Sequence, residues 1–160
     1  MRAAPFALLA AALACGGCQG ITYTPLAPLD PRGAAPYAMK GAGSVTGQAY
    51  AQSNGDKSWA AGKKVYLVPD LPHFQDWLKR TIVHGNGPNL DPQDSRYVRI
   101  AEADDAGSFS FAGVPDGKYV VLVVAYWEYP DPTGNMITKG GPASEEIEVA
   151  RGAPVQVDLH

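Results

Sequence analysis

The chain of 160 residues carries 13 basic and 16 acidic side chains, a net charge of −3 at pH 7, and two cysteines. An acidic chain without a basic cluster is not typical of nucleic-acid-binding proteins, because binding to phosphates depends on clustered lysine and arginine. Residues 43–160 are enough for one domain with one hydrophobic core. We therefore expect a single domain and no nucleic-acid partner.

The N-terminus predicts an export signal. Met1 and Arg2 precede an apolar run, Ala3 to Ala14, which is too short to span a bilayer because a spanning helix needs about 20 residues. Cys15 and Cys18 close this run, where a bacterial lipoprotein signal places the thiol that receives diacylglycerol. We predict a lipoprotein signal and lipobox over residues 1–18, lipidated at Cys15 or, as the second choice, at Cys18.

Other interpretations of the two cysteines stay open. The chain could be an ordinary secreted protein with two stray thiols, or the cysteines could form a Cys-x-x-Cys metal or redox motif. A redox pair needs a helix N-terminus beside a βαβ pattern, and this pair precedes a proline-rich segment instead. Neither cysteine is followed by aspartate, which in a Gram-negative envelope favours the outer membrane, facing the periplasm.

Residues 19–42 are rich in proline and show neither helical nor strand periodicity. This composition favours an extended polyproline II tether between the anchor and the domain. The alternative is a segment packed along the edge of the domain through Tyr23, Leu29 and Tyr37.

The remaining chain predicts seven short strands with apolar alternation, at 43–51, 65–68, 96–101, 108–111, 119–127, 146–149 and 155–159. Val45 and Ala49 share one face of the first strand, and Val65 and Leu67 share one face of the second. Residues 119–127 are almost continuously apolar, which predicts a central strand covered on both faces. Arg151 and Gly152 have the chemistry of a hairpin turn between the last two strands.

Residues 70–95 form an insertion that interrupts this strand pattern. Phe74, Trp77, Leu78 and Ile82 recur at helical spacing and predict about two turns of helix after Pro72. An irregular loop rich in glycine, asparagine and proline follows.

The most informative stretch is residues 103–122, where an acidic turn, Gly-x-Phe-x-Phe and Pro-x-Gly-x-Tyr follow one another. These positions are Asp105, Gly107, Phe109, Phe111, Pro115, Gly117 and Tyr119. Their order resembles the carboxypeptidase regulatory-like, or transthyretin-like (prealbumin-like), family over residues 43–160. The resemblance implies an all-β fold, a seven-stranded antiparallel β-sandwich with a short helical insertion after the second strand.

The same resemblance implies an accessory or interaction module whose motif residues serve folding rather than catalysis. Tyr119 after Pro115 and Gly117 resembles a tyrosine corner, in which the ring packs in the core and the hydroxyl bonds a nearby backbone carbonyl.

The sequence shows no local motif for catalysis. A hydrolase needs a nucleophile with an oriented base, or a metal with three or four ligands. We therefore predict no enzyme activity, no metal and no other cofactor, with His73 and His84 as solvated loop histidines. The alternative is a small hydrolase or metal-binding protein with its site in the 70–95 insertion. That site would use His73 and His84 with Asp70, Asp76 or Asp91.

Three aspartates lie in turns near one rim of the expected sandwich: Asp104, Asp105 and Asp116. Carboxylates in such places could collect calcium, but aspartate also caps turns by accepting backbone N–H bonds without any metal. We expect caps.

Several aromatic side chains, Trp59 among them, lie outside the expected core. Phe74, Trp77, Trp127 and Tyr129 predict a ligand-binding surface on which a glycan or peptide would stack. The alternative is that Phe74 and Trp77 dock the helix over an open sheet edge or face.

The sequence as a whole predicts a non-catalytic envelope lipoprotein that acts as a binding or scaffolding module. Its expected partners are the membrane, through the N-terminal lipid, and either another envelope protein or a cell-wall glycan.

Overall fold

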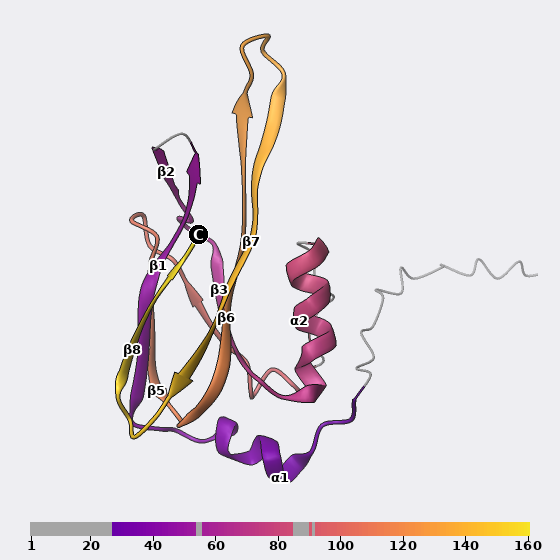
Figure 1. Ribbon diagram of the computed structural model, residues 1–160, viewed down its shortest axis with the longest axis vertical. Helices are drawn as coiled ribbons and strands as arrows, with labels where there is room; N and C mark the ends of the chain where they lie inside the picture. The colour runs from indigo at the N-terminus through magenta and orange to yellow at the C-terminus, as the bar shows by residue number, and fades with distance from the viewer. Residues whose placement is uncertain (1–26, 54–55, 85–89, 91) are drawn as a thin grey trace, which may run out of the picture.

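Two β-sheets packed face to face, with a helix on the outer face of one of them, make up the fold (Figure 1). The computed structural model describes residues 27–53, 56–84, 90 and 92–160. The predicted signal and both cysteines lie outside these residues. Within the described ranges, no helix is long and apolar enough to cross a bilayer. The predicted all-β sandwich with a short helix is confirmed.

The first sheet is built around β1 (Gly43–Ser53), which pairs with β2 (Asp56–Trp59), β5 (Ser108–Val114) and β8 (Pro154–Leu159). The pairings with β2 and β5 are antiparallel, and the pairing with β8 is parallel. The sandwich is therefore not antiparallel throughout. As predicted, Val45 and Ala49 are fully buried.

Strand β2 was not predicted, so the described residues form eight strands rather than seven. Its four residues follow a segment with turn chemistry and pair with the end of β1, Tyr50 opposite Trp59. A four-residue strand is too short to show an alternation that stands out from the neighbouring turn. The predicted helix consequently follows the third strand and not the second.

The second sheet has the order β4-β3-β6-β7. Its strands are β3 (Lys64–Pro69), β4 (Arg99–Glu102), β6 (Gly117–Pro130) and β7 (Met136–Val149). Strand β4 begins three residues later than predicted. The preceding residues form a turn, in which the Tyr97 N–H donates to the Asp94 carbonyl. The Tyr97 and Val98 side chains are buried among the residues around the helix.

The strand predicted at 146–149 is only the end of a much longer strand, β7. It pairs with the whole of β6, from Gly117 opposite Val149 to Pro130 opposite Met136. Gly140, Gly141 and Pro142 concealed it, because glycine and proline weaken a strand pattern. Pro142 is tolerated because β7 is an edge strand, where a missing N–H breaks no ladder. The hairpin extends past the rest of the sandwich as an arm (Figure 1).

The tip of this arm is fixed by one side chain. The Asp131 carboxylate accepts hydrogen bonds from the Thr133 hydroxyl and from the backbone N–H groups of Thr133 and Asn135. These bonds, that from the Thr133 hydroxyl foremost, hold the pKa of Asp131 below its usual range. Tyr126, Met136 and Ile137 remain exposed on the arm.

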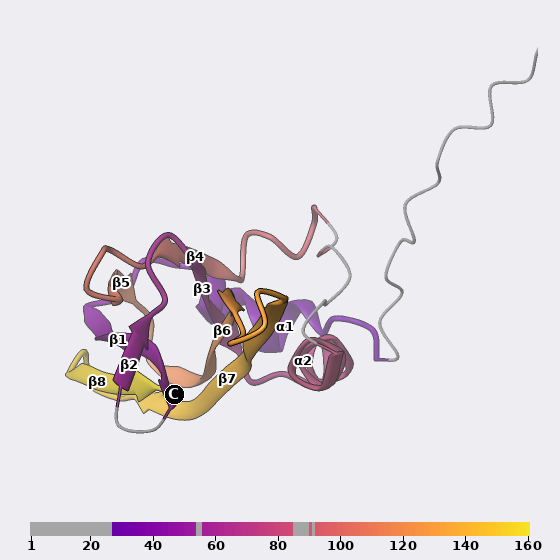
Figure 2. The same cartoon turned by 90° about the horizontal axis from the view of Figure 1, so that it is seen from above.

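Helix α2 (Pro72–His84) packs on the face of the second sheet that points away from the first sheet (Figure 2). It is 13 residues long, about twice the predicted length. Phe74, Trp77 and Leu78 are buried there against Val120 and Leu122 of β6. The predicted double covering of β6 is therefore present, since Val121 and Val123 point into the core between the sheets.

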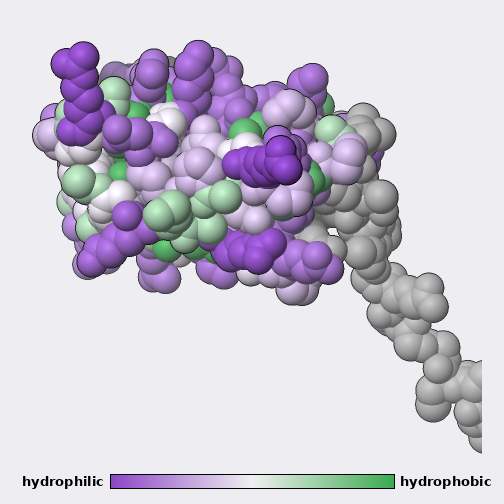
Figure 3. All heavy atoms as spheres, turned by 90° about the horizontal axis from the view of Figure 1, so that it is seen from below, coloured by the Kyte–Doolittle hydropathy of each residue, from purple (hydrophilic) through white to green (hydrophobic). Residues whose placement is uncertain are grey.

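The segment predicted as an extended tether is partly structured. Within it, α1 (Pro31–Ala34) and the 3₁₀ helix η1 (Ala35–Ala38) follow the Asp30 N-cap. Ala34 is fully buried, and Leu29 and Tyr37 pack against the cluster around α2. Leu29 and Tyr37 thus pack along the domain, as the alternative interpretation has it. Tyr23, the third residue of that interpretation, lies outside the described residues. This end of the molecule is mostly hydrophilic, with small separate apolar areas (Figure 3).

The turns within residues 103–122 and the turn at Arg151 and Gly152 connect strands of different sheets. The turns after β4, β5 and β7 each carry the chain across the core, so Arg151 and Gly152 are not a hairpin turn. Asp116 ties two of these turns together, because its carboxylate accepts the N–H groups of Arg151 and Gly152, both at 2.9 Å. Gly107 has φ +71°, and a Cβ there would lie 2.4 Å from the Ala49 carbonyl oxygen.

The tyrosine corner expected at Tyr119 is present. Its ring is buried in the core with Phe109 and Phe111, and its hydroxyl donates to the Pro115 carbonyl at 2.9 Å. Burial raises the pKa of the Tyr119 hydroxyl. The hydroxyl therefore acts as a neutral donor that fixes the start of β6, at Gly117.

We predict that Tyr119→Phe lowers the free energy of unfolding by about 1 kcal/mol, because one buried hydrogen bond is lost and the ring is kept. Chemical denaturation measures this, with Tyr126→Phe on the exposed arm as the matched control. Equal stability of the two variants would contradict a structural role for the hydroxyl.

Candidate functional site

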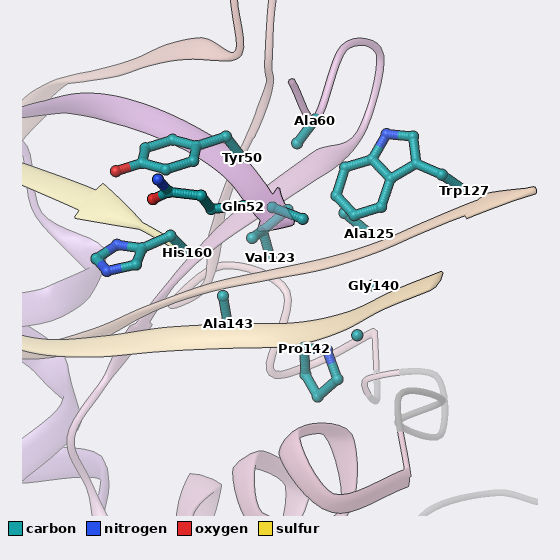
Figure 4. Close-up of a pocket in the computed structure, with 12 residues that line it drawn as sticks. Tyr50, Gln52, Ala60, Val123, Ala125, Trp127, Gly140, Pro142, Ala143 and His160 are labelled. Carbon is teal, nitrogen blue, oxygen red and sulfur yellow. The ribbon is translucent and has the colours of Figure 1, made fainter. Parts of the chain in front are cut away.

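A cavity of about 270 Å³ lies where the β1–β2 hairpin and the β6–β7 arm diverge (Figure 4). Tyr50 and Gln52 of β1 and His160 after β8 line one side, and Trp127 and residues 140–143 line the other. The floor consists of small or apolar buried side chains, Ala60, Val123 and Ala125. The cavity is thus an extension of the sandwich core that opens to solvent at one end.

Trp127 is held rigidly at the rim. Its indole N–H donates to the Trp59 carbonyl at 3.2 Å, which joins the arm to the end of β2. Gly140 lies beneath the ring: it has φ +98°, and a Cβ there would lie 2.2 Å from the Ala125 carbonyl oxygen and 2.5 Å from the indole. Only glycine fits this backbone and this contact.

Tyr50 forms the opposite side of the cavity and has three aromatic or cationic neighbours. Its ring meets Trp59 edge-on, with centroids 5.5 Å apart, and stacks on the His160 imidazole at 5.4 Å. The ammonium group of Lys57 lies 3.9 Å from the centre of the Tyr50 ring, within the range of a cation–π interaction.

Tyr129 completes the connection between the arm and β2. Its hydroxyl shares a hydrogen bond of 2.6 Å with the Ser58 hydroxyl, and the Lys139 ammonium lies 5.8 Å from its ring centre. Tyr129 does not line the cavity but fixes the arm that carries Trp127.

The four side chains of the predicted ligand-binding surface do not lie on one surface. Trp127 lines the cavity and Tyr129 lies near it, whereas Phe74 and Trp77 are buried under α2, only 1% and 4% exposed. Their apolar rings cover the outer face of β6. They therefore match the alternative prediction, in which Phe74 and Trp77 dock the helix on the sheet.

His73, expected in solvent, is buried and joins two distant segments. Its Nδ1 lies 2.8 Å from the Ala27 carbonyl oxygen and its Nε2 lies 2.8 Å from the Asp94 carboxylate. Both ring nitrogens are thus occupied in fixing the insertion and the N-terminal segment to each other. Asp91 and the His84 side chain, also named for an enzyme site, lie outside what the structure describes.

Two of the three turn aspartates, Asp104 and Asp116, act as caps. Asp104 accepts the N–H groups of Ala106 and Ser108, and Asp116 accepts those of the last turn. Among the residues described, no three His, Cys, Asp or Glu side chains gather in a way that could hold a metal ion.

Comparison with solved structures relates the chain to one protein over most of both lengths. PA1324 from Pseudomonas aeruginosa, described as a "putative carbohydrate binding protein", has a TM-score of 0.67 and 26% identity, over 82% of this chain and 97% of that chain. No protein-family model and no curated protein sequence matches the chain. The β-sandwich is supported, and the carboxypeptidase regulatory-like family stays a prediction.

Two further solved structures are more distant. The major pilin subunit BcpA of Bacillus cereus has a TM-score of 0.43 and 12% identity, over 74% of this chain and 29% of that chain. A DUF3823 family protein from Parabacteroides merdae has a TM-score of 0.37 and 15% identity, over 73% and 44%. No argument about function rests on these two.

We predict that Gly140→Ala displaces the Trp127 ring and lowers the free energy of unfolding by roughly 1–3 kcal/mol more than Gly134→Ala, because overpacking adds to backbone strain. Both glycines have positive φ, but Gly134 has open space around it. Thermal unfolding and the tryptophan emission maximum measure the difference. Identical behaviour of the two variants would show that Trp127 does not rest on Gly140.

We predict that His73→Phe, which keeps the ring volume, lowers the free energy of unfolding by about 1–3 kcal/mol, because the Asp94 carboxylate and the Ala27 carbonyl lose their partner. Denaturant titration measures this loss, with His160→Phe at an exposed position as the control. An unchanged midpoint for His73→Phe would assign the two contacts no energetic weight.

Proposed function

We propose that this protein is a non-catalytic binding module that takes a carbohydrate into the cavity between β1–β2 and the β6–β7 arm. The observation that carries this proposal is the cavity itself, with an apolar floor and a rim of Tyr50, Trp127 and His160. Concave, mostly apolar sites with a few polar groups are the usual form of small-ligand sites. The volume of about 270 Å³ is slightly below the usual range of such sites, roughly 300–1,000 Å³, and suits one end of a glycan chain.

The composition of the rim favours binding over hydrolysis. Most glycoside hydrolases place a pair of Asp or Glu side chains on either side of the bond that is cleaved. No described residue that lines the cavity is Asp or Glu. His73, the buried histidine that an enzyme site would have used, is bonded to Ala27 and Asp94 on the far side of the second sheet.

The similarity to PA1324 supports the same ligand class. That protein is described as a "putative carbohydrate binding protein", and the match covers nearly its whole length. A shared fold at 26% identity is consistent with a shared kind of ligand, although folds alone do not carry function. The proposal therefore rests first on the cavity.

The cellular setting belongs to the proposal as well. Lipidation at Cys15 would anchor the chain in the envelope, in the outer membrane and facing the periplasm. A carboxypeptidase regulatory-like domain in that place would display its binding site towards cell-wall glycan or another envelope protein. The arm and β2 lie at the end of the sandwich opposite α1 (Figure 1), and the cavity lies between them. An anchored domain would present them away from its attachment.

Intrinsic tryptophan fluorescence tests the proposed site. We predict that cell-wall glycan fragments change the emission of the purified protein saturably, and that Trp127→Ala weakens binding by roughly tenfold or more, as loss of a central aromatic contact does. Trp77→Phe removes a buried tryptophan under α2 and should leave the affinity unchanged.

The controls separate loss of binding from loss of folding. Circular dichroism and thermal unfolding establish that Trp127→Ala is folded, and Tyr50→Ala tests the opposite side of the cavity. Saturable binding that survives both substitutions would place the site elsewhere. No response to any neutral or acidic glycan would remove carbohydrate binding as the function.

A further inference from the structure

Two lysines stand beside the aromatic rings of the site. Lys57 lies over the Tyr50 ring at 3.9 Å and within 5.4 Å of the Trp59 ring centre, and Lys139 lies 5.8 Å from the Tyr129 ring centre. A cation over a ring face is restrained in position while its other N–H donors stay available. Both lysines therefore hold a positive charge at defined places.

The strand register places each lysine on the same strand face as a residue of the cavity lining. Lys57 is directly opposite Gln52, and Lys139 is directly opposite Trp127. Gln52 and Trp127 line the cavity, and residues opposite each other on paired strands share a face. Neither lysine lines the cavity itself, so the two cations stand beside its rim, one on β2 and one on the arm.

No acidic partner neutralises these cations within the described part of the chain. The ion pairs found there are His73–Asp94 and Arg80–Asp76, both around α2. Glu128 is next to Trp127 in sequence, and neighbouring residues of a strand point to opposite faces, so it lies on the other face of the arm. In a chain whose net charge is −3, Lys57 and Lys139 therefore supply positive charge beside the cavity.

The ring contacts also limit how a sugar can bind. Tyr50 already has Lys57 over its ring and His160 stacked on it. The Tyr50 ring therefore has little free surface on which a neutral sugar could stack, and it holds Lys57 in place instead. Trp127, with Gly140 beneath it, is the ring left to define the position of a sugar.

We propose that the ligand of this cavity is an anionic carbohydrate, one whose carboxylate or phosphate groups are bound by Lys57 and Lys139 while its ring lies beside Trp127. This inference rests on the proposed carbohydrate site and adds the charge of the ligand. The ammonium groups donate hydrogen bonds to the anionic oxygens, and the attraction is screened by salt.

Matched ligands test the charge directly. Titration calorimetry of the full chain would compare oligogalacturonate with its methyl ester, a glucuronate oligomer with the corresponding glucose oligomer, and a sugar phosphate with the free sugar. We expect the acidic member to bind roughly five- to twentyfold more tightly, since each exposed charge pair contributes about two- to fivefold. The preference should shrink as salt is raised from low to physiological concentration. The carboxylate and phosphate pairs show which anion is preferred.

Matched variants assign the effect to the two lysines. Lys57→Met and Lys139→Met should each reduce affinity for the acidic ligand about two- to fivefold and leave that for the neutral ligand unchanged. Lys118→Met, on β6 next to the strand's first residue at the far end of the sandwich, removes the same charge and should change neither. Thermal unfolding establishes that each variant is folded.

The outcomes separate the two proposals. Equal or tighter binding of the neutral members overturns the anionic ligand and leaves carbohydrate binding standing. A preference for acid that persists in the Lys57→Met, Lys139→Met double variant also overturns it, because other groups then carry the charge recognition. Binding of none of the ligands overturns the carbohydrate site and this inference with it.

Discussion

Strand β6 must be covered on both of its faces, and the rest of the fold is arranged around this constraint. Tyr119, Val121 and Val123 face the first sheet, while Val120 and Leu122 face α2. One partner sheet can cover only one face, so the insertion between β3 and β4 supplies the second layer. Fully burying a side chain such as Phe74 or Leu78 contributes about 1.5–3 kcal/mol. Past the sandwich the same strand continues into the arm, which places Trp127 beside the cavity.

The local pattern of the sequence predicts strands well and their pairing poorly. Alternation depends on neighbouring residues, so the buried faces of Val45, Ala49, Val65 and Leu67 could be assigned correctly. A turn reverses the chain in the same way whether the next strand pairs with the previous one or crosses the core. The hydrogen bonds that the Asp116 carboxylate accepts from the N–H groups of Arg151 and Gly152 join residues far apart in sequence. No local signal distinguishes that arrangement from a hairpin.

The insertion shows the same limit for single side chains. Helical spacing predicted α2, and the docking alternative described Phe74 and Trp77, because an apolar stripe on a short helix has to be buried somewhere. His73 gave no such signal. Its partners are Asp94 and the Ala27 carbonyl, which tertiary packing alone brings to it, so solvation was the reasonable expectation. The prolines that favoured a tether also hid the 3₁₀ turn, since proline suits the first turn of a helix as well as an extended chain.

The cavity depends on pairing register more than on any motif. Trp127 and Tyr129 could be singled out because they lie beyond the regular core, but Tyr50, Lys57 and Lys139 join them only through the β1–β2 and β6–β7 registers. The register that sets Trp127 opposite Lys139 also brings Gly140 beneath the indole. An aromatic lining open to water would by itself favour association between molecules. Lys57 lies over the Tyr50 ring and Lys139 near the Tyr129 ring, so each sets a charge beside the aromatic side chains. An anionic sugar would pair with these charges. Under the proposal of an anionic ligand, Lys57 and Lys139 would serve both solubility and ligand choice.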